Sequence, residues 1–408
     1  MLFTFYTCLL LLMTSGLGTV QAQDIHEDNE DMSINSPYQK LAPNNIDFAF
    51  NLFQYLQSVA PDENIIFSPI SVSMALSMLA LGADSQTGTQ ILQGSGFNHS
   101  EIPDSEIHQS FQELYHLLGQ SDDNSEMNMG NALFFKQSLK LLDLYSEDLQ
   151  HYYGLEKVPI DFKNWAKGSN QINEYIKSKT QGKISDLLSD LKDPALLTLV
   201  NYISLTGTWK LPFHPDDTTE GDFFKKDNSV VKVPMMYQAN NFNFLFDPLL
   251  GCISVMLDYV GNSTFYFILP DVKDIDNVIQ ALSQDALQRW SESVITSYLE
   301  VHVPRLSLSG TYELGDIMKA QGVVDFQREQ TYLFGIAVPR KLSKVIHKTN
   351  LRITEKGKEA AAPPVSTSGG QGETAQLTKI QFNRPFILMI FDNVSWSSLF
   401  LGKVVNPS

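Results

Sequence analysis

The sequence is poor in cysteine, in positive charge and in long apolar runs. Its 408 residues include 2 cysteines, Cys8 and Cys252, and Cys8 lies in an N-terminal segment that is predicted below to be removed. Cys252 is then alone, so no intramolecular disulfide can form. Lysine and arginine number 29 against 46 aspartates and glutamates, and the net charge of -17 opposes binding to nucleic acid or anionic membranes. No later run reaches the roughly 18 apolar residues of a membrane span.

Signatures of common enzymes are also missing. The sequence has no Gly-x-Ser-x-Gly, no Walker loop and no His-Glu-x-x-His, so we expect no catalytic residue, metal or cofactor. The glycines from Gly369 to Gly372 follow no strand pattern and precede no capped helix, which argues against a phosphate-binding loop. Apolar neighbours surround Cys252, which is typical of a buried side chain rather than a reactive thiol. His347 is interpreted as a hydrogen-bonded strand residue.

The N-terminus has the pattern of an export signal. An apolar core from Leu9 to Met13 is followed by Val20-Gln21-Ala22, which predicts a signal over 1–22 that is cleaved after Ala22. Asn98, Asn262 and Asn393 each begin an Asn-x-Ser/Thr acceptor triplet, which agrees with a secreted glycoprotein. No heptads and no paired cysteines occur, so we expect an extracellular monomer.

The remaining residues, 23–408, contain no Pro/Gly/Ser-rich linker and no internal repeat, which favours one large domain. Apolar residues recur at helical spacing over Ile46–Ala60 and Ser71–Leu81. Strand patterns rich in β-branched and aromatic residues occur at Thr198–Ser204, Thr264–Leu269, Leu299–Pro304 and Phe386–Phe391. Helices and strands alternate without a repeating βαβ rhythm, so the predicted fold class is α+β.

One segment, 356–378, is unlike packed globular structure. It begins with alanines, passes through Pro363 and Pro364, and continues as a serine- and glycine-rich run. A segment of this length and composition is expected to be an exposed, protease-sensitive loop.

The order of this loop and its flanking motifs resembles the serpin family. The matching stretches are Asn45–Phe50, Phe67–Ser71, Thr180–Ile184, Leu199–Tyr202, Glu355–Ala362, Phe382–Phe386 and Phe400–Pro407. The resemblance implies three β-sheets surrounded by about eight or nine helices. It also implies that 356–378 is an exposed reactive-centre loop, which can insert into the largest sheet after cleavage.

Other stretches resemble the hormone-carrying branch of that family: Met127–Phe134, Tyr259–Asn262, Phe267–Asp271 and Ser395–Phe400. The resemblance implies extracellular transport of a steroid hormone, a glucocorticoid or a progestin, with release linked to loop cleavage. It places the site between the helix around Leu282–Trp290, the helix near Asn45, and the strands bearing Met256 and Trp396.

Residue chemistry agrees with that site but leaves alternatives open. Gln284 and Gln288 are four apart, so a helix presents both amides on one face, where they can hydrogen-bond a steroid without charge. Such pairs are more often plain solvent-facing helix residues. An indole suits an uncharged steroid, so Trp396 is assigned to ligand stacking, although it could instead fill the core. The steroid carriers of the family have a glutamine where this chain has Met256, and the positions of Gln284, Gln288 and Asn393 also differ.

The alternative function is inhibition of serine proteases by the family's suicide-trapping mechanism. In the family, the strand face that begins at Lys358 turns inward when the loop inserts, and burying an ammonium costs several kcal/mol. Pro363 and Pro364 lack the donors of a central strand. Elastase-like proteases are therefore expected to cleave the loop without being trapped, at a bond near Gln371–Thr374 that is not assigned. The hinge residues are Gly357, Lys358, Glu359, Ala360, Ala361 and Ala362.

Overall fold

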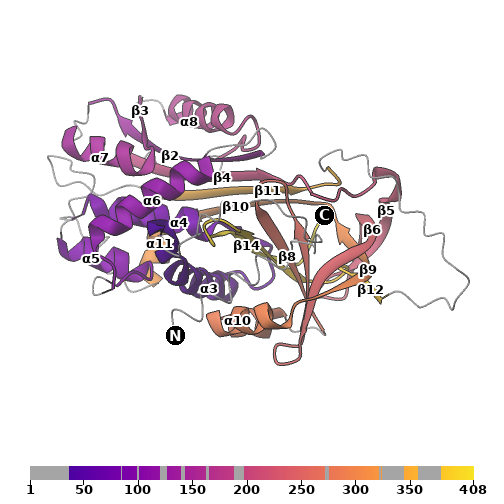
Figure 1. Cartoon of the computed structure of the whole chain (residues 1–408). Coiled ribbons are helices and arrows are strands. Elements are labelled where there is room, and N and C mark those ends of the chain that lie inside the picture. Colours follow the sequence, from indigo (N-terminus) through magenta and orange to yellow (C-terminus); the bar gives the residue numbers. More distant parts are fainter. Residues whose placement is uncertain are drawn as a thin grey trace, which may run out of the picture.

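The computed structural model describes residues 36–83, 85–98, 101–119, 126–138, 143–161, 165–187, 197–271, 275–320, 323, 344–356 and 378–408. The predicted signal over 1–22 and the hinge residues Gly357–Ala362 lie outside the described residues, as does the rest of the loop up to 377. Figure 1 shows helices α4 to α7 gathered at one end, with the long strands β6 and β9 at the other.

The described residues form ten α-helices, against the eight or nine expected. The two helices predicted from apolar spacing are confirmed as α3 and α4, and α4 is buried almost all round because serine and alanine alternate with large apolar residues. Ser68 caps α4 by accepting a hydrogen bond from Ser71 N. The helices are α2 Pro37–Lys40, α3 Ala42–Val59, α4 Pro69–Leu81, α5 Ser85–Gly94, α6 Asp104–Gly119, α7 Asp143–Tyr153, α8 Trp165–Lys179, α9 Ile275–Ala281, α10 Gln284–Ser293 and α11 Leu314–Ala320.

A five-stranded sheet has the strand order β10-β11-β4-β2-β3. The strands are β2 Glu126–Lys136, β3 Glu156–Ile160, β4 Leu197–Thr206, β10 Leu306–Glu313 and β11 Lys344–Ile353. Strands β4 and β11 are parallel and pair directly from Thr198 with Lys344 to Thr206 with Arg352. No strand separates them, so insertion of a further strand at this place would first require them to part.

The other strands form one continuous ladder, β1-β14-β13-β8-β7-β6-β9-β12, with β5 paired to β6. Strand β6 is 18 residues long and pairs with β5 at its start and with β7 at its end. It therefore joins the two smaller sheets that the resemblance implies. The bounds are β1 Ile65–Phe67, β5 Thr219–Phe224, β6 Val230–Asp247, β7 Cys252–Asp258, β8 Ser263–Pro270, β9 Ile295–Pro304, β12 Thr378–Gln381, β13 Phe386–Asp392 and β14 Ser398–Val404.

The prediction for His347 is confirmed by a buried polar cluster between α4 and the five-stranded sheet. His347 is fully buried, its Nε2 accepts a hydrogen bond from Ser68 N at 3.1 Å, and its Nδ1 lies 2.6 Å from Asn201 Oδ1. Since a carboxamide oxygen only accepts, Nδ1 carries the proton and the ring is neutral. Burial lowers the pKa of His347 to about 3. Ser71 Oγ donates to the same Asn201 oxygen at 2.8 Å, which ties α4 to β4.

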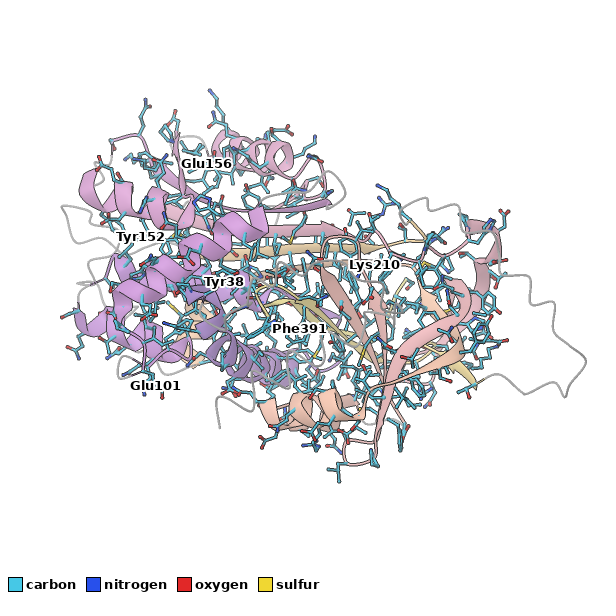
Figure 2. The ribbon with its side chains drawn as sticks, in the orientation of Figure 1. Tyr38, Glu101, Tyr152, Glu156, Lys210 and Phe391 are labelled. Carbon is cyan, nitrogen blue, oxygen red and sulfur yellow. The ribbon has the colours of Figure 1, made fainter. Side chains whose placement is uncertain are left out.

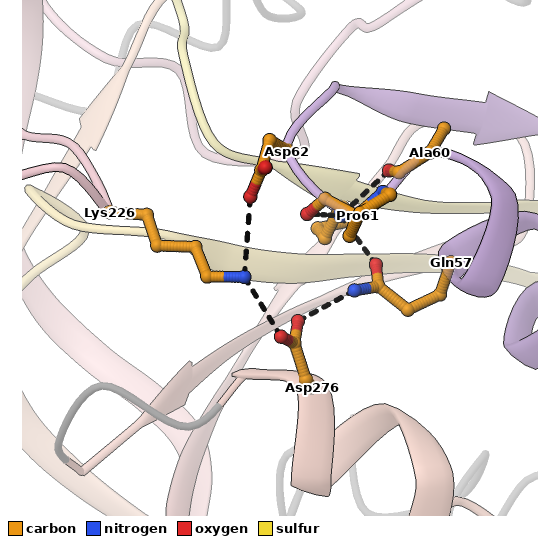
Figure 3. Close-up of polar contacts among 7 residues, drawn as sticks. Gln57, Ala60, Pro61, Asp62, Lys226 and Asp276 are labelled. Carbon is orange, nitrogen blue, oxygen red and sulfur yellow. Dashed lines mark hydrogen bonds and ion pairs between the residues drawn. The ribbon is translucent and has the colours of Figure 1, made fainter.

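The C-terminal strand β14 is fastened by a second buried polar cluster (Figure 3). Lys403 is fully buried, and its Nζ donates to Gln57 Oε1, to Pro61 O at 2.7 Å and to Ala60 O at 3.3 Å. Gln57 Nε2 in turn donates to Asp276 Oδ1 of α9 at 2.7 Å. The end of β14 is thereby linked to the end of α3 and the start of α9.

Two findings bear on function classes that the sequence disfavours. Within the described ranges, no helix is long and apolar enough to span a membrane. The same part of the chain holds no group of three or more histidine, cysteine, aspartate or glutamate side chains arranged to bind a metal ion.

Candidate functional site

One face of the sheet formed by β7, β8 and β13 carries the first predicted site residue. Met256 on β7 pairs with Tyr266 on β8, and Thr264, two residues before Tyr266, pairs with Phe391 on β13. Alternate residues of a strand share a face, so Met256, Tyr266 and Phe391 point to the same side. The Tyr266 and Phe391 rings meet edge to face with centroids 5.8 Å apart. Together these residues form an apolar floor, and Figure 2 marks Phe391 at the centre of the molecule.

Helix α10 contacts β6 and α3 and carries two more predicted residues. Trp290 Nε1 donates to Asp247 Oδ2 of β6 at 2.7 Å, and the Ser283 side chain caps the helix by accepting from Ala286 N. Gln284 Nε2 donates to Pro43 O of α3 at 2.9 Å. Gln288 is half-buried one turn further along. One N–H of Gln284 therefore links α10 to α3 and is not available to a ligand.

Trp396 lies in the turn between β13 and β14. Its backbone φ is 57°, in the left-handed region that bulky residues rarely adopt, and its side chain is 3% exposed. The Asp392 carboxylate holds the turn by accepting hydrogen bonds from Ser395 N and Ser395 Oγ, each at 2.7 Å. Burial raises the pKa of Asp392. The hydrogen-bonded turn thus fixes the orientation of the Trp396 indole.

The chain between α2 and the start of α3 connects the two halves of the candidate site. Gln39 Nε2 donates to Val394 O in the Trp396 turn at 3.1 Å, while Pro43 O accepts from Gln284. Five consecutive residues, Gln39–Pro43, therefore hold both the turn and α10. Met256 also lines a cavity of about 390 Å³, which Gln284, Gln288 and Trp396 do not border.

Sequence reasoning overlooked four side chains at this site: Asp47, Tyr266, Phe391 and Asp392. Asp47 lies beside the Gln284 amide, and burial together with the charge of Asp285 outweighs that amide and raises the pKa of Asp47. Asp47 is four residues after Pro43, so helical spacing could have placed it toward the same neighbour. The alternation of β8 and β13 could likewise have identified Tyr266 and Phe391.

The remaining predicted residues differ in accessibility. Asn98 and Asn262 have exposed side chains, whereas Asn393 is half-buried and its Nδ2 donates to Thr264 Oγ1 at 3.2 Å. Cys252 is fully buried and free, and burial raises the pKa of its thiol to about 12. The prediction that Cys252 is a buried, inert side chain is therefore confirmed.

Comparison with known proteins agrees with this architecture. The family model described as Serpin (serine protease inhibitor) matches residues 43–407. Corticosteroid-binding globulin of Sus scrofa is 50% identical and covers 100% of both chains, and that of Homo sapiens is 47% identical over 98% of both. The structure of human thyroxine-binding globulin complexed with thyroxine has a TM-score of 0.84 and 36% identity, over 91% of this chain and 100% of that one.

Human glycosylated kallistatin is also similar, with a TM-score of 0.82 and 37% identity over 91% of this chain and 99% of that one. The family model spans nearly the entire described chain, and the similar proteins include carriers named for two different hormones. The chain belongs to the serpin family.

Proposed function

We propose that this protein carries a steroid hormone in extracellular fluid and is not an enzyme. The observation that carries the proposal is the junction of α2 and α3. It binds both α10, which bears Gln284 and Gln288, and the Trp396 turn, next to the apolar floor of Met256. Similarity to proteins named corticosteroid-binding globulin extends over the full chain and supports the same ligand class.

The four predicted site residues suit a neutral ligand; they are Met256, Gln284, Gln288 and Trp396. None of them is basic, and Asp47 adds an acidic group beside Gln284, so an anionic ligand would gain no cation here. Trp396 is 3% exposed, so a ligand reaches its indole only after the covering side chains move aside. Stacking that then buries about 100 Å² of apolar surface would contribute about 2.5 kcal/mol. Each amide hydrogen bond would contribute about 1 kcal/mol net. The Gln284 amide donates to Pro43 O and hydrogen-bonds the Asp47 carboxyl, so its Oε1 remains as an acceptor for a ligand hydroxyl.

Release of the hormone is proposed to be linked to cleavage of the loop over 356–378. Trp209, just after β4, donates from its backbone N to Lys356 O at 3.0 Å and from its indole to Thr354 O at 2.8 Å. These bonds hold the root of the loop against the end of β4. A strand that entered between β4 and β11 would have to break the ladder that ends beside them.

From Trp209 a series of contacts leads to the Trp396 turn. Lys210 N donates to Asp258 O at 3.0 Å, and Asp258 Oδ1 accepts from Thr264 Oγ1 at 3.2 Å. The same hydroxyl accepts from Asn393 Nδ2, three residues before Trp396. If the hormone binds more tightly while the loop is expelled from the sheet, then bound hormone must in turn stabilise the arrangement with the loop expelled. Loop cleavage would then weaken hormone binding.

Protease inhibition is the second candidate, and the description of the matching family model favours it. We propose instead that elastase-like proteases cleave the loop without being trapped, because Lys358, Pro363 and Pro364 would slow its insertion. We further propose export after removal of 1–22, glycosylation at Asn98 and Asn262, and a monomeric state.

Equilibrium binding of tritiated cortisol to the secreted protein tests the carrier function. Trp396→Ala should weaken binding by roughly 50-fold, the equivalent of about 2.5 kcal/mol. Gln288→Ala should weaken it by roughly fivefold. Val394→Ala serves as the matched control, because it truncates an exposed side chain of the same turn. Cortisol binding by Trp396→Ala as tight as by the parent would refute this pocket. An SDS-stable complex with trypsin, chymotrypsin or elastase would refute the non-inhibitory proposal.

A further inference from the structure

The cavity of about 390 Å³ that Met256 lines occupies a gap in the sheet. Strand β5 pairs with β6 as far as Met235, and β7 pairs with β6 from Asn243 onward. The stretch of β6 between those residues has no described strand on that edge. Instead, the chain after β4 passes there, held by Gln238 Nε2, which donates to Pro212 O at 3.1 Å.

The lining of this cavity combines an apolar floor with a polar mouth. Phe242, Met256 and Leu257 are buried and supply the floor. Lys210, which Figure 2 labels, and Asp258 carry the charges, and their Nζ and Oδ2 atoms are 3.5 Å apart. A volume of this size lies within the usual range for small-molecule sites.

Two polar groups of the cavity, Lys210 Nζ and Gln238 Oε1, keep hydrogen-bonding capacity. Among the described residues, Lys210 Nζ makes no hydrogen bond, and half of its side chain is exposed. Gln238 Oε1 is buried and has no hydrogen-bond partner in that same part of the chain. Asp258 is different, because its Oδ1 already accepts from Thr264 Oγ1. An ion-paired but half-exposed donor and an acceptor without a partner thus lie beside an apolar floor.

We propose that this cavity binds a neutral, largely apolar molecule whose carbonyl oxygen accepts a hydrogen bond from Lys210 and whose hydroxyl, where present, donates to Gln238. Neutrality follows from the charges at the mouth. A carboxylate would lie beside Asp258 on a protein of net charge -17, and an ammonium would lie beside Lys210.

The position of the cavity gives its occupant a regulatory role. Met256 belongs both to the cavity wall and to the floor of the candidate hormone site. Lys210 follows Trp209, which holds the root of the loop through Lys356 O. An occupant that braces Lys210 against β7 would therefore favour the arrangement with the loop expelled. The effect on hormone affinity rests on the proposed function, whereas binding to the cavity does not.

Fluorescence titration with the neutral naphthyl ketone prodan, in the presence of saturating cortisol, tests the site. The parent should bind one equivalent, with enhanced and blue-shifted emission. Lys210→Met should weaken binding by roughly 10- to 100-fold, because it removes a charged donor and keeps the apolar stem. Asn241→Trp should abolish binding, because an indole on this exposed position of the lining would fill the cavity. Lys232→Met is the matched control, since Lys232 is an exposed lysine of β6 that pairs with Asp222 outside the cavity.

Thermal unfolding of each variant confirms that it is folded before its titration is interpreted. Absence of saturable prodan binding by the parent would overturn the proposal. So would prodan binding by folded Lys210→Met and Asn241→Trp proteins that equals the parent's. A parent that binds prodan but not cortisol would refute the hormone-carrier function and leave this site intact.

Discussion

Replacing Lys403 by methionine isolates the energetic effect of one buried charge. Lys403 lies at the far end of β14 from the Trp396 turn and is fully buried, with Gln57 Oε1, Ala60 O and Pro61 O as its acceptors. Methionine keeps an unbranched apolar stem and removes the ammonium. The comparison therefore measures what burial of the charge does to the stability of the C-terminal strand.

The size of the effect follows from the pKa. Burial lowers the pKa of Lys403 from 10.5 to about 8, with Lys226 acting in the same direction and Asp276, Asp62 and Glu63 opposing it. Each pKa unit corresponds to about 1.36 kcal/mol, so the folded state disfavours the charged form by about 3 kcal/mol relative to the unfolded state. This difference is a substantial fraction of the stability of a typical domain.

The sign is set by which state binds more protons. Between pH 8 and pH 10.5 the unfolded chain keeps the Lys403 proton, whereas the folded chain releases it. The free energy of unfolding therefore rises with pH across this window, and the contribution is lost again as the pH falls through about 8. From about pH 7.5 to pH 9.5, Lys403 should add about 2 kcal/mol to the stability of the parent protein.

Urea unfolding at several pH values in this window tests the prediction. The free energy of unfolding of Lys403→Met should lack the 2 kcal/mol rise, whatever its absolute stability, since the three orphaned acceptors cost the same at each pH. Lys232→Met is the control, because Lys232 is exposed, its hydrogen bond to Asp222 raises its pKa, and it does not contribute to the shift of Lys403. Parallel pH profiles for the parent and Lys403→Met would refute the reasoning.

Three further predictions concern buried or half-buried groups. His347 has a pKa of about 3 when folded, so the unfolded state gains its proton first and the parent should lose about 1.5 kcal/mol of unfolding free energy between pH 6.5 and 5. In urea titrations, the unfolding free energy of His347→Gln should fall by about 1.5 kcal/mol less than that of the parent over this pH range. Equal losses in the two proteins would contradict the low pKa of His347. Cys252, with a pKa of about 12 and no exposed surface, should react with a disulfide reagent roughly a thousandfold more slowly in native protein than in urea, and comparable rates would show that the thiol is accessible. Asn393→Gln should leave the glycan mass of the secreted protein unchanged, because Ser395 of its triplet is fully buried and Asn393 bonds Thr264, whereas Asn262→Gln should reduce it. A mass loss from Asn393→Gln would place a glycan on the turn.

Local patterns in the sequence were enough for the elements and the family. Apolar spacing over Ile46–Ala60 and alternation over Phe386–Phe391 predicted α3 and β13 to within a few residues, because each element buries a face with its own period. Apolar neighbours likewise predicted the burial of Cys252. The resemblance indicated the region in which Trp396, Gln284 and Met256 lie.

Only the tertiary structure determined the hydrogen-bond partners and the surroundings of those residues. The Gln284 amide donates a hydrogen bond to Pro43 O, 241 residues away in the sequence. The ammonium of Lys403 is buried by groups more than 340 residues earlier in the chain. Strand β4 closes directly onto β11, and the cavity beside Lys210 exists only because β5 and β7 leave part of one β6 edge free. Periodicity specifies which face of an element is buried but not which distant element covers it. Hydrogen-bond partners, burial of charge and cavities therefore emerge only when the elements pack.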